Sequence, residues 1–206
     1  MSGSSGVSAI VLAGGRSRRY GSDKLAATVE GRPLLDLAIV GVAAVSSEVL
    51  VVLAPGDDRG LPVEMHVPVR RVADPELHGG PLVGLLAGLE AAREPLVVVA
   101  GGDMPSLSTA VLGAMIRALG ARATVDAVVL ETRGDRPPLP AALRTGAATA
   151  MARRLVGDGE RRLRSLFERL PTRALSEREW RPLDPTEATL LDVDEPADLP
   201  GSRQTD

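Results

Sequence analysis

The chain lacks cysteine and has very few aromatic residues, and each shortage excludes a class of function. Without cysteine it forms no disulfide, has no thiolate zinc site and performs no thiol catalysis. Tyr20, Phe167 and Trp180 are the only aromatic residues, so the core must be aliphatic and the stacking platforms of single-stranded nucleic-acid binders are missing. The formal net charge of −3 argues against a duplex-binding surface, which needs a basic excess. Nucleic acid is therefore not an expected partner.

Long hydrophobic runs are also missing. No apolar stretch approaches the roughly 18 residues that a membrane helix needs, so no membrane partner is expected. No charged and apolar leader marks export, which makes the cytoplasm the expected location. A chain of 206 residues has the length for one domain with a full core. We expect that domain at residues 7–200, between a flexible N-terminus or tag at 1–6 and a flexible tail at 201–206.

What the chain does contain is a regular alternation of apolar and amphipathic segments. The strongest expected strands are 7–12, 48–54, 95–100 and 125–130. The helices expected between them are 33–45, 80–92 and 108–119. This alternation predicts an α/β fold, a single-domain three-layer α/β/α sandwich with a mostly parallel twisted sheet of the Rossmann-like nucleotide-binding kind. A last short strand is expected at 189–194.

The loop after the first expected strand is the first candidate site. It ends at Lys24, the single lysine among 24 basic residues. Gly14 and Gly15 allow consecutive backbone amides to point at an anion, and Arg19 and Lys24 add positive charge. The spacing matches neither a Walker loop nor a G-x-G-x-x-G pattern. The loop therefore predicts a triphosphate site, with a solvated basic turn as the alternative.

Acidic residues at the ends of expected strands form the second candidate site. Asp103 follows the strand at 95–100, where ligands bind in open α/β sheets, and its hard oxygen suits Mg²⁺ that bridges phosphates. The alternative is a turn or helix-capping aspartate. Asp192 and Asp194 would point the same way in an extended strand, and they would either complete the metal site or solvate the strand end. The run 159–162 is basic enough to bind an anionic second substrate, or it is simply solvated.

Three of these motifs resemble those of one enzyme group. The pattern L-A-G-G-x-S-x-R-x-G-x-D-K at 12–24 resembles the signature loop of the nucleotidyltransferases of the glycosyltransferase-A-like fold. Gly102-Asp103-Met104-Pro105 resembles their metal motif, and Asp192-Val193-Asp194-Glu195-Pro196 resembles their closing motif. The resemblance extends from about residue 7 to residue 199, nearly the whole chain.

Within that group the chain is most similar to the molybdenum cofactor guanylyltransferases, the MobA-like NTP transferases. The features shared with them are the run 80–85 after Asp74, the extended segment around Pro138, and the run 159–162 before a helix. The resemblance implies transfer of GMP from GTP to the phosphate of molybdopterin, with release of pyrophosphate and with Mg²⁺ as cofactor. It also implies transient contact with enzymes that make or accept the cofactor.

The resemblance also assigns roles to individual residues. Lys24, Arg19 and Asp103 would be catalytic, with Asp103 and Asp194 holding the metal. Arg161, Arg162 and Asp192 would bind the acceptor. Contacts to the nucleotide would come from Leu12, Ala13, Gly14, Gly15, Lys24, Asp74 and Asp103.

Other functions would use the same first loop and Asp103. Tyr20 stands where the family usually has methionine, and Asp192 and Asp194 stand where guanylyltransferases often have asparagine. A cytidylyltransferase for the same cofactor, or a sugar-phosphate nucleotidyltransferase, is therefore the first alternative. A non-catalytic nucleotide-binding or cofactor-chaperone module is the second.

Overall fold

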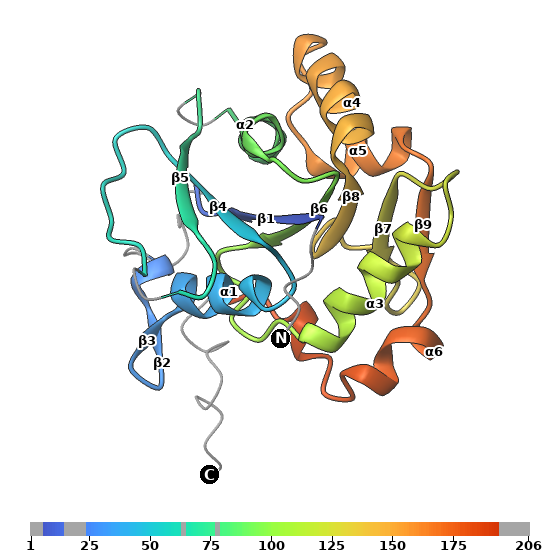
Figure 1. Ribbon diagram of the computed structural model, residues 1–206, viewed down its shortest axis with the longest axis horizontal. Coiled ribbons are helices and arrows are strands. Elements are labelled where there is room, and N and C mark those ends of the chain that lie inside the picture. The colour runs from blue at the N-terminus through green and yellow to red at the C-terminus, as the bar shows by residue number, and fades with distance from the viewer. Residues whose placement is uncertain (1–5, 15–23, 63–64, 77–78, 194–206) are drawn as a thin grey trace.

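Continuous apolar segments form the central strands of a twisted sheet (Figure 1). A computed structural model of the chain describes residues 6–14, 24–62, 65–76 and 79–193. The strands β1 (Val7–Leu12), β4 (Glu48–Leu53), β6 (Leu96–Gly101) and β7 (Ala127–Leu130) are buried over nearly their whole length. Strands covered on both faces have no polar face, which is why they appear in the sequence as unbroken apolar runs.

The strand order creates a topological switch point beside β1. The sheet runs β5-β4-β1-β6-β8-β7-β9, with β5 (Val69–Ala73) at one edge and β9 (Thr172–Leu175) at the other. All neighbours are parallel except β8 (Ala141–Arg144), which is antiparallel to both β6 and β7. From β1 the chain proceeds to β4 and β5 on one side and returns to β6 on the other. Ligands bind at such a reversal in open α/β sheets.

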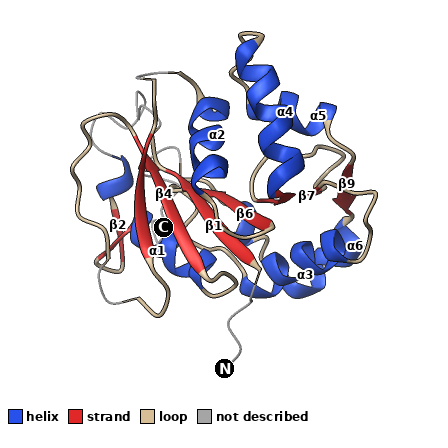
Figure 2. Ribbon diagram, turned by 45° about the horizontal axis from the view of Figure 1, so that its top comes forward, coloured by secondary structure: helices blue, strands red, loops and turns tan. Residues whose placement is uncertain are grey.

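Helices cover both faces of the sheet (Figure 2). One face carries α1 (Leu34–Ala43), α3 (Thr109–Gly120) and the short α6 (Glu177–Trp180). The other face carries α2 (Pro81–Ala91), α4 (Thr145–Gly157) and α5 (Leu163–Arg169). Two separate aliphatic clusters fill the spaces between the layers. The predicted three-layer, mostly parallel sandwich is confirmed.

Several short elements lie outside the seven-stranded sheet and its covering helices. The 3-10 helix η1 (Lys24–Ala26) leads into a two-stranded hairpin of β2 (Thr28–Val29) and β3 (Arg32–Pro33). Two further 3-10 helices, η2 (Arg181–Leu183) and η3 (Ala188–Leu190), follow α6. None of these elements was expected from hydrophobic periodicity, because each is too short to show a period.

The prediction of a strand at 189–194 is wrong for residues 189–193, which are the ones that the structure describes. Residues 188–190 form η3, and residues 191–193 pair with no strand. Glu187 adopts a left-handed φ of 57° just before η3, and the Asp184 carboxylate accepts a hydrogen bond from the Thr189 amide at 2.7 Å. These local contacts bend the chain into a turn. The sheet edge beside β7 is instead filled by β9.

The ends of the chain are only partly described. Residues 1–5 and 194–206 lie outside the described residues, so the expected flexible N-terminus and tail are not tested. The carbonyl of Gly6 accepts a hydrogen bond from the Leu96 amide at 3.2 Å. In the described part of the chain, no helix combines the length and the apolar character needed to cross a membrane.

Candidate active site

A cavity of about 370 Å³ opens at the switch point, where the carboxyl ends of the central strands meet. Its walls come from the ends of β1, β4 and β6, the loop after β5, the first turns of α2, the connection between β7 and β8, and the first residue of α5. The lining residues are Leu12, Gly14, Val52, Asp74, Gly80, Pro81, Gly84, Gly101, Asp103, Leu139 and Leu163. The walls are largely apolar and carry two carboxylates, which is typical of a site that binds and orients a small molecule.

Asp74 follows edge strand β5 and is held firmly at the cavity wall. Its amide donates to the carbonyl of Leu53 at 2.8 Å, which ties it to the end of β4. One carboxylate oxygen, Oδ1, accepts from the Glu76 amide at 3.0 Å. The other, Oδ2, lies close to glycines: a Cβ atom at Gly84 would be 3.2 Å from it, and one at Gly14 would be 3.7 Å away. Glycine at position 84 therefore lets α2 approach the carboxylate closely, whereas the 3.7 Å at Gly14 is an ordinary van der Waals distance.

Asp103 follows β6 through a turn at Gly102, and its carboxylate lies close to Gly101. A Cβ atom at Gly101 would collide with Asp103 Oδ1, so the carboxylate folds back over the strand end. The Gly102 amide donates to the carbonyl of Leu12 at 2.9 Å and joins this turn to the end of β1. The Asp103 carbonyl accepts from the Val193 amide at 3.1 Å. The predicted position of Asp103 at the carboxyl edge of a central strand is confirmed.

The amino end of α2 also lines the cavity. Gly80 precedes the helix with a φ of +88°, and a Cβ atom there would be 2.9 Å from Cβ of Arg161. Pro81 occupies the first turn, where its missing amide hydrogen costs no hydrogen bond. No acidic residue lies in that turn, so the partial positive charge of the helix end is not neutralised there. The amides of this turn are already engaged, since Leu82 donates to the Arg161 carbonyl and Val83 to the Gly80 carbonyl, each at 3.1 Å, so this helix end offers an anion its partial charge rather than free donors.

The turn that contains Arg161 and Arg162 lies beside the amino end of α2. The Arg161 carbonyl accepts from the Leu82 amide at 3.1 Å. Its guanidinium donates to the carbonyls of Val156 and Glu160, each at 3.1 Å, and lies 3.5 Å from the Glu76 carboxylate. Arg161 is thus held beside the loop that contains Asp74.

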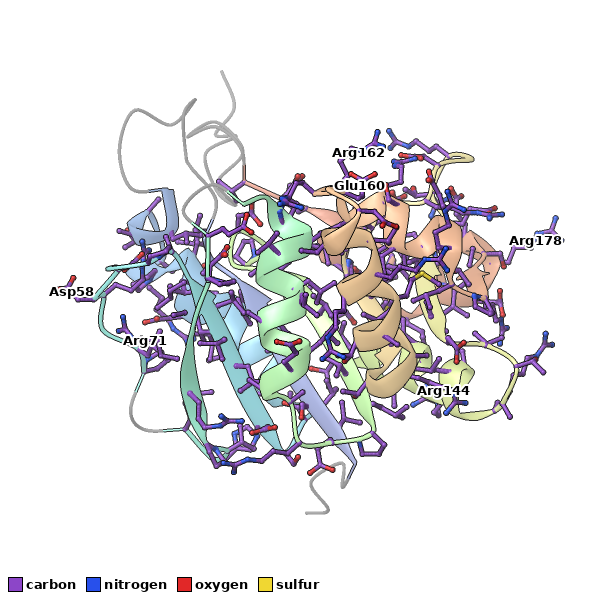
Figure 3. All side chains as sticks on the ribbon, turned by 90° about the horizontal axis from the view of Figure 1, so that it is seen from above. Asp58, Arg71, Arg144, Glu160, Arg162 and Arg178 are labelled. Atoms are coloured by element: carbon purple, nitrogen blue, oxygen red, sulfur yellow. The ribbon has the colours of Figure 1, made fainter. Side chains whose placement is uncertain are left out.

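Arg162 points away from the protein next to Glu160 (Figure 3). The Glu160 carboxylate accepts hydrogen bonds from the Arg162 guanidinium, from the Ser165 hydroxyl and from the amides of Arg161 and Arg162. These hydrogen bonds, with that of the Arg162 side chain the largest cause, hold the pKa of Glu160 well below its usual range. Glu160 therefore stays ionised and organises the turn.

The structure brings together several of the predicted site residues. Leu12, Gly14, Asp74 and Asp103 line one cavity, while Ala13 is buried and its amide donates to the carbonyl of Val52 at 2.8 Å. Asp192 is exposed, one residue before the contact between Val193 and Asp103. Three predicted site residues, Gly15, Arg19 and Asp194, lie outside the described residues. The backbone of Lys24 is described, but its side chain is not.

Other cavity residues were not predicted as site residues. Gly80 and Gly84 lie one helical turn apart, and this spacing was a signal in the sequence that they share a face of α2. Leu139, in the connection between β7 and β8, and Leu163, the first residue of α5, offered no such signal, because their place at the cavity depends on tertiary packing. Within the described ranges, no group of three or more histidine, cysteine or acidic residues is arranged to hold a metal.

Residues 9–174 match the family described as the MobA-like NTP transferase domain. A probable molybdenum cofactor guanylyltransferase of Chloroflexus aggregans is 35% identical over 201 residues, which cover 94% of this chain and 91% of that protein. The molybdenum cofactor guanylyltransferase of Burkholderia vietnamiensis is 37% identical over 172 residues, which cover 81% and 83% respectively.

Solved structures agree with this fold. The crystal structure of molybdopterin-guanine dinucleotide biosynthesis protein A from Archaeoglobus fulgidus aligns with a TM-score of 0.73 at 23% identity, covering 93% of this chain and 94% of that one. The fold and the extent of the sequence match agree: the chain belongs to the MobA-like NTP transferase family.

Proposed function

We propose that this protein is a molybdenum cofactor guanylyltransferase, which transfers GMP from GTP to the phosphate of molybdopterin and releases pyrophosphate. The observation that carries the proposal is the cavity at the switch point, which gathers Gly14, Asp74, Asp103 and the amino end of α2. The names of the relatives from Chloroflexus aggregans and Burkholderia vietnamiensis support guanine as the base.

The nucleotide would bind along the ends of β1 and α2. Backbone groups of 12–15 would contact it, and the amino end of α2 would attract its phosphates. Asp74 would bind the nucleoside, since its rigid carboxylate accepts hydrogen bonds from hydroxyl or amino groups. Lys24 and Arg19 would neutralise the negative charge that develops on pyrophosphate as it leaves.

The residues around Asp103 fit a magnesium ion. Mg²⁺ in proteins is usually bound through one or two carboxylates together with substrate phosphates, rather than by a cage of protein ligands. Asp103 offers one carboxylate at the cavity, and no cluster of three ligands surrounds it in the described residues. Asp103 would therefore hold Mg²⁺, with Asp194 as a second ligand. When bound, Mg²⁺ would neutralise negative charge on the nucleotide phosphates.

The reaction needs no covalent intermediate with the protein. An oxygen of the molybdopterin phosphate attacks the α-phosphorus of GTP in line and forms a new phosphorus–oxygen bond. The bond between the α-phosphorus and the oxygen that bridges to the β-phosphorus breaks, and its electron pair leaves with pyrophosphate. Arg161, Arg162 and Asp192 would orient the acceptor. The protein thus acts by positioning and by electrostatic stabilisation.

Pyrophosphate release tests this function directly. The purified protein is incubated with Mg²⁺, molybdopterin and each of the four ribonucleoside triphosphates in turn. Release with GTP alone is the expected result. Release with CTP alone would identify a cytidylyltransferase, and release only with a sugar phosphate in place of molybdopterin would change the acceptor. Binding of GTP without release under any condition would favour a non-catalytic nucleotide-binding module.

We also propose that the reaction takes place in the cytoplasm. The expected partners are GTP and molybdopterin, with transient contact to enzymes that make or accept the cofactor. The absence of cysteine is compatible with a reducing compartment.

Gly84→Ala is expected to weaken GTP binding about tenfold while the fold keeps nearly its full stability. The added methyl group would lie 3.2 Å from Asp74 Oδ2 and 3.4 Å from Val52 Cγ1, so it would displace the carboxylate and fill part of the cavity. Alanine also favours the helix by up to about 1 kcal/mol, which offsets the strain. Calorimetric titration with GTP measures the affinity.

The matched control for this variant is Gly146→Ala in α4, where a Cβ atom meets nothing within 4 Å. It should bind GTP as the unmodified protein does. Equal affinity in Gly84→Ala and Gly146→Ala would show that Gly84 does not border the nucleotide.

A further inference from the structure

The segment 184–193, here called the closing segment, holds both ends of the loop that contains Asp103. That loop comprises residues 102–108, between β6 and α3. At its start, the Asp103 carbonyl accepts from the Val193 amide at 3.1 Å. At its end, the Ser108 amide donates to the Thr189 hydroxyl at 3.0 Å. These contacts join residues 90 and 81 positions apart in sequence.

Asp184 holds the closing segment in the shape that makes these contacts. Its carboxylate accepts from the Thr189 amide at 2.7 Å and from the Thr186 hydroxyl at 2.9 Å. Asp184 is buried, with 7% of its surface exposed. Burial alone would raise its pKa, but the hydrogen bonds from Thr189 and Thr186 outweigh it and lower the pKa. The carboxylate is therefore charged and fully engaged inside the protein.

Thr189 is the link between Asp184 and the Asp103 loop. It is completely buried, its amide binds Asp184, and its hydroxyl oxygen accepts from Ser108. Ser108 in turn caps α3, because its own hydroxyl accepts from the Val111 amide at 3.4 Å. Thr189 therefore holds the end of the loop, because its hydroxyl oxygen is the acceptor of the partly buried Ser108 amide.

We propose that Asp184 and Thr189 are positioning residues that set the Asp103 loop, and with it the Asp103 carboxylate, for binding of the metal–nucleotide complex. The proposal rests on the proposed function, since it assigns a task to residues around the same site. Neither residue lines the cavity. Both act through the backbone of the loop, which has to keep its carboxylate at a defined place because metal binding depends sharply on ligand position.

Thr189→Val tests the proposal, with Thr189→Ser as its matched variant. Valine has nearly the same shape but no oxygen for the Ser108 amide, whereas serine keeps the oxygen. The readout is the affinity for Mn²⁺ in the presence of GTP, measured by electron paramagnetic resonance, together with kcat for pyrophosphate release. Thr189→Val should weaken Mn²⁺ binding and lower kcat, each about tenfold, and Thr189→Ser should stay within about twofold of the unmodified protein.

Thr145→Val separates positioning from general stability. The Thr145 hydroxyl donates to the carbonyl of Glu94 at 2.6 Å, at the end of β6 opposite Asp103. This control should lose thermal stability but keep its Mn²⁺ affinity. The proposal is overturned if Thr189→Val melts at a lower temperature yet binds Mn²⁺ and turns over normally. If Thr189→Val does not fold, Asp184→Asn carries the same test, and normal Mn²⁺ affinity in that variant overturns the proposal.

These outcomes are distinct from a failure of the proposed function. If the unmodified protein releases no pyrophosphate from GTP but loses Mn²⁺ affinity on Thr189→Val, the proposed function fails and the positioning role stands. If the unmodified protein is active and Thr189→Val leaves Mn²⁺ affinity unchanged, only the positioning role fails.

Discussion

Asp103→Asn is expected to lower kcat about a thousandfold while the melting temperature changes little. Asparagine keeps the size of the side chain, and the main-chain hydrogen bond from Val193 to residue 103 does not depend on the side chain. What is lost is the negative charge, which a neutral amide cannot replace as a ligand for a hard cation. Pyrophosphate release at saturating GTP and Mg²⁺ measures the effect.

Two further variants show whether the charge and its position both matter. Asp158→Asn, in the exposed turn after α4, removes a carboxylate away from the cavity and should leave kcat unchanged. Gly101→Ala keeps the Asp103 carboxylate but pushes it away, because the new Cβ atom would collide with Oδ1. It should lower kcat about a hundredfold. If Asp103→Asn retains near-normal activity, Asp103 is not a metal ligand.

Lys24→Arg is expected to lower kcat about a hundredfold even though the charge is conserved. Lysine presents a compact ammonium on a flexible stem, whereas the guanidinium is a broad planar fork. The chain uses arginine at 23 of its 24 basic positions and lysine only here, which indicates a site where the fork does not fit. The measurement is kcat and KM for GTP in parallel.

The reciprocal substitution provides the control. Arg32→Lys, at an exposed position of β3, exchanges the same two residue types in the opposite direction and should leave both constants unchanged. Lys24→Met removes the charge and should be more damaging than Lys24→Arg. Normal kinetics in Lys24→Arg would mean that the single lysine has no chemical role.

The central fold and part of the cavity could be predicted because their signals are local. Strands β1, β4 and β6 are apolar runs, and α2 and α3 show helical spacing. Once these alternate, a parallel sheet follows, and parallel strands place their following loops at one edge. Asp103 and Gly14 could therefore be assigned to one edge of the sheet from the sequence.

The C-terminal part could not be predicted in the same way. The segment at 189–194 has apolar residues and spaced aspartates like a strand, yet its described part is a turn that Asp184 organises from five residues upstream. The real edge strand β9 has the short sequence Thr-Arg-Ala-Leu, which carries no strong period. Pairing with β7 rather than local pattern decides which segment is a strand here.

By itself, the sequence determined the α/β alternation, the family and the residue types available for chemistry, since hydrophobic periodicity and side-chain identity are properties of neighbouring residues. Only the tertiary structure decided that Leu139 and Leu163 line the same cavity as Asp103, and that the closing segment binds both ends of the Asp103 loop. These arrangements depend on contacts between residues far apart in the chain. Such contacts are set by how the helices and strands pack, and no local pattern encodes them.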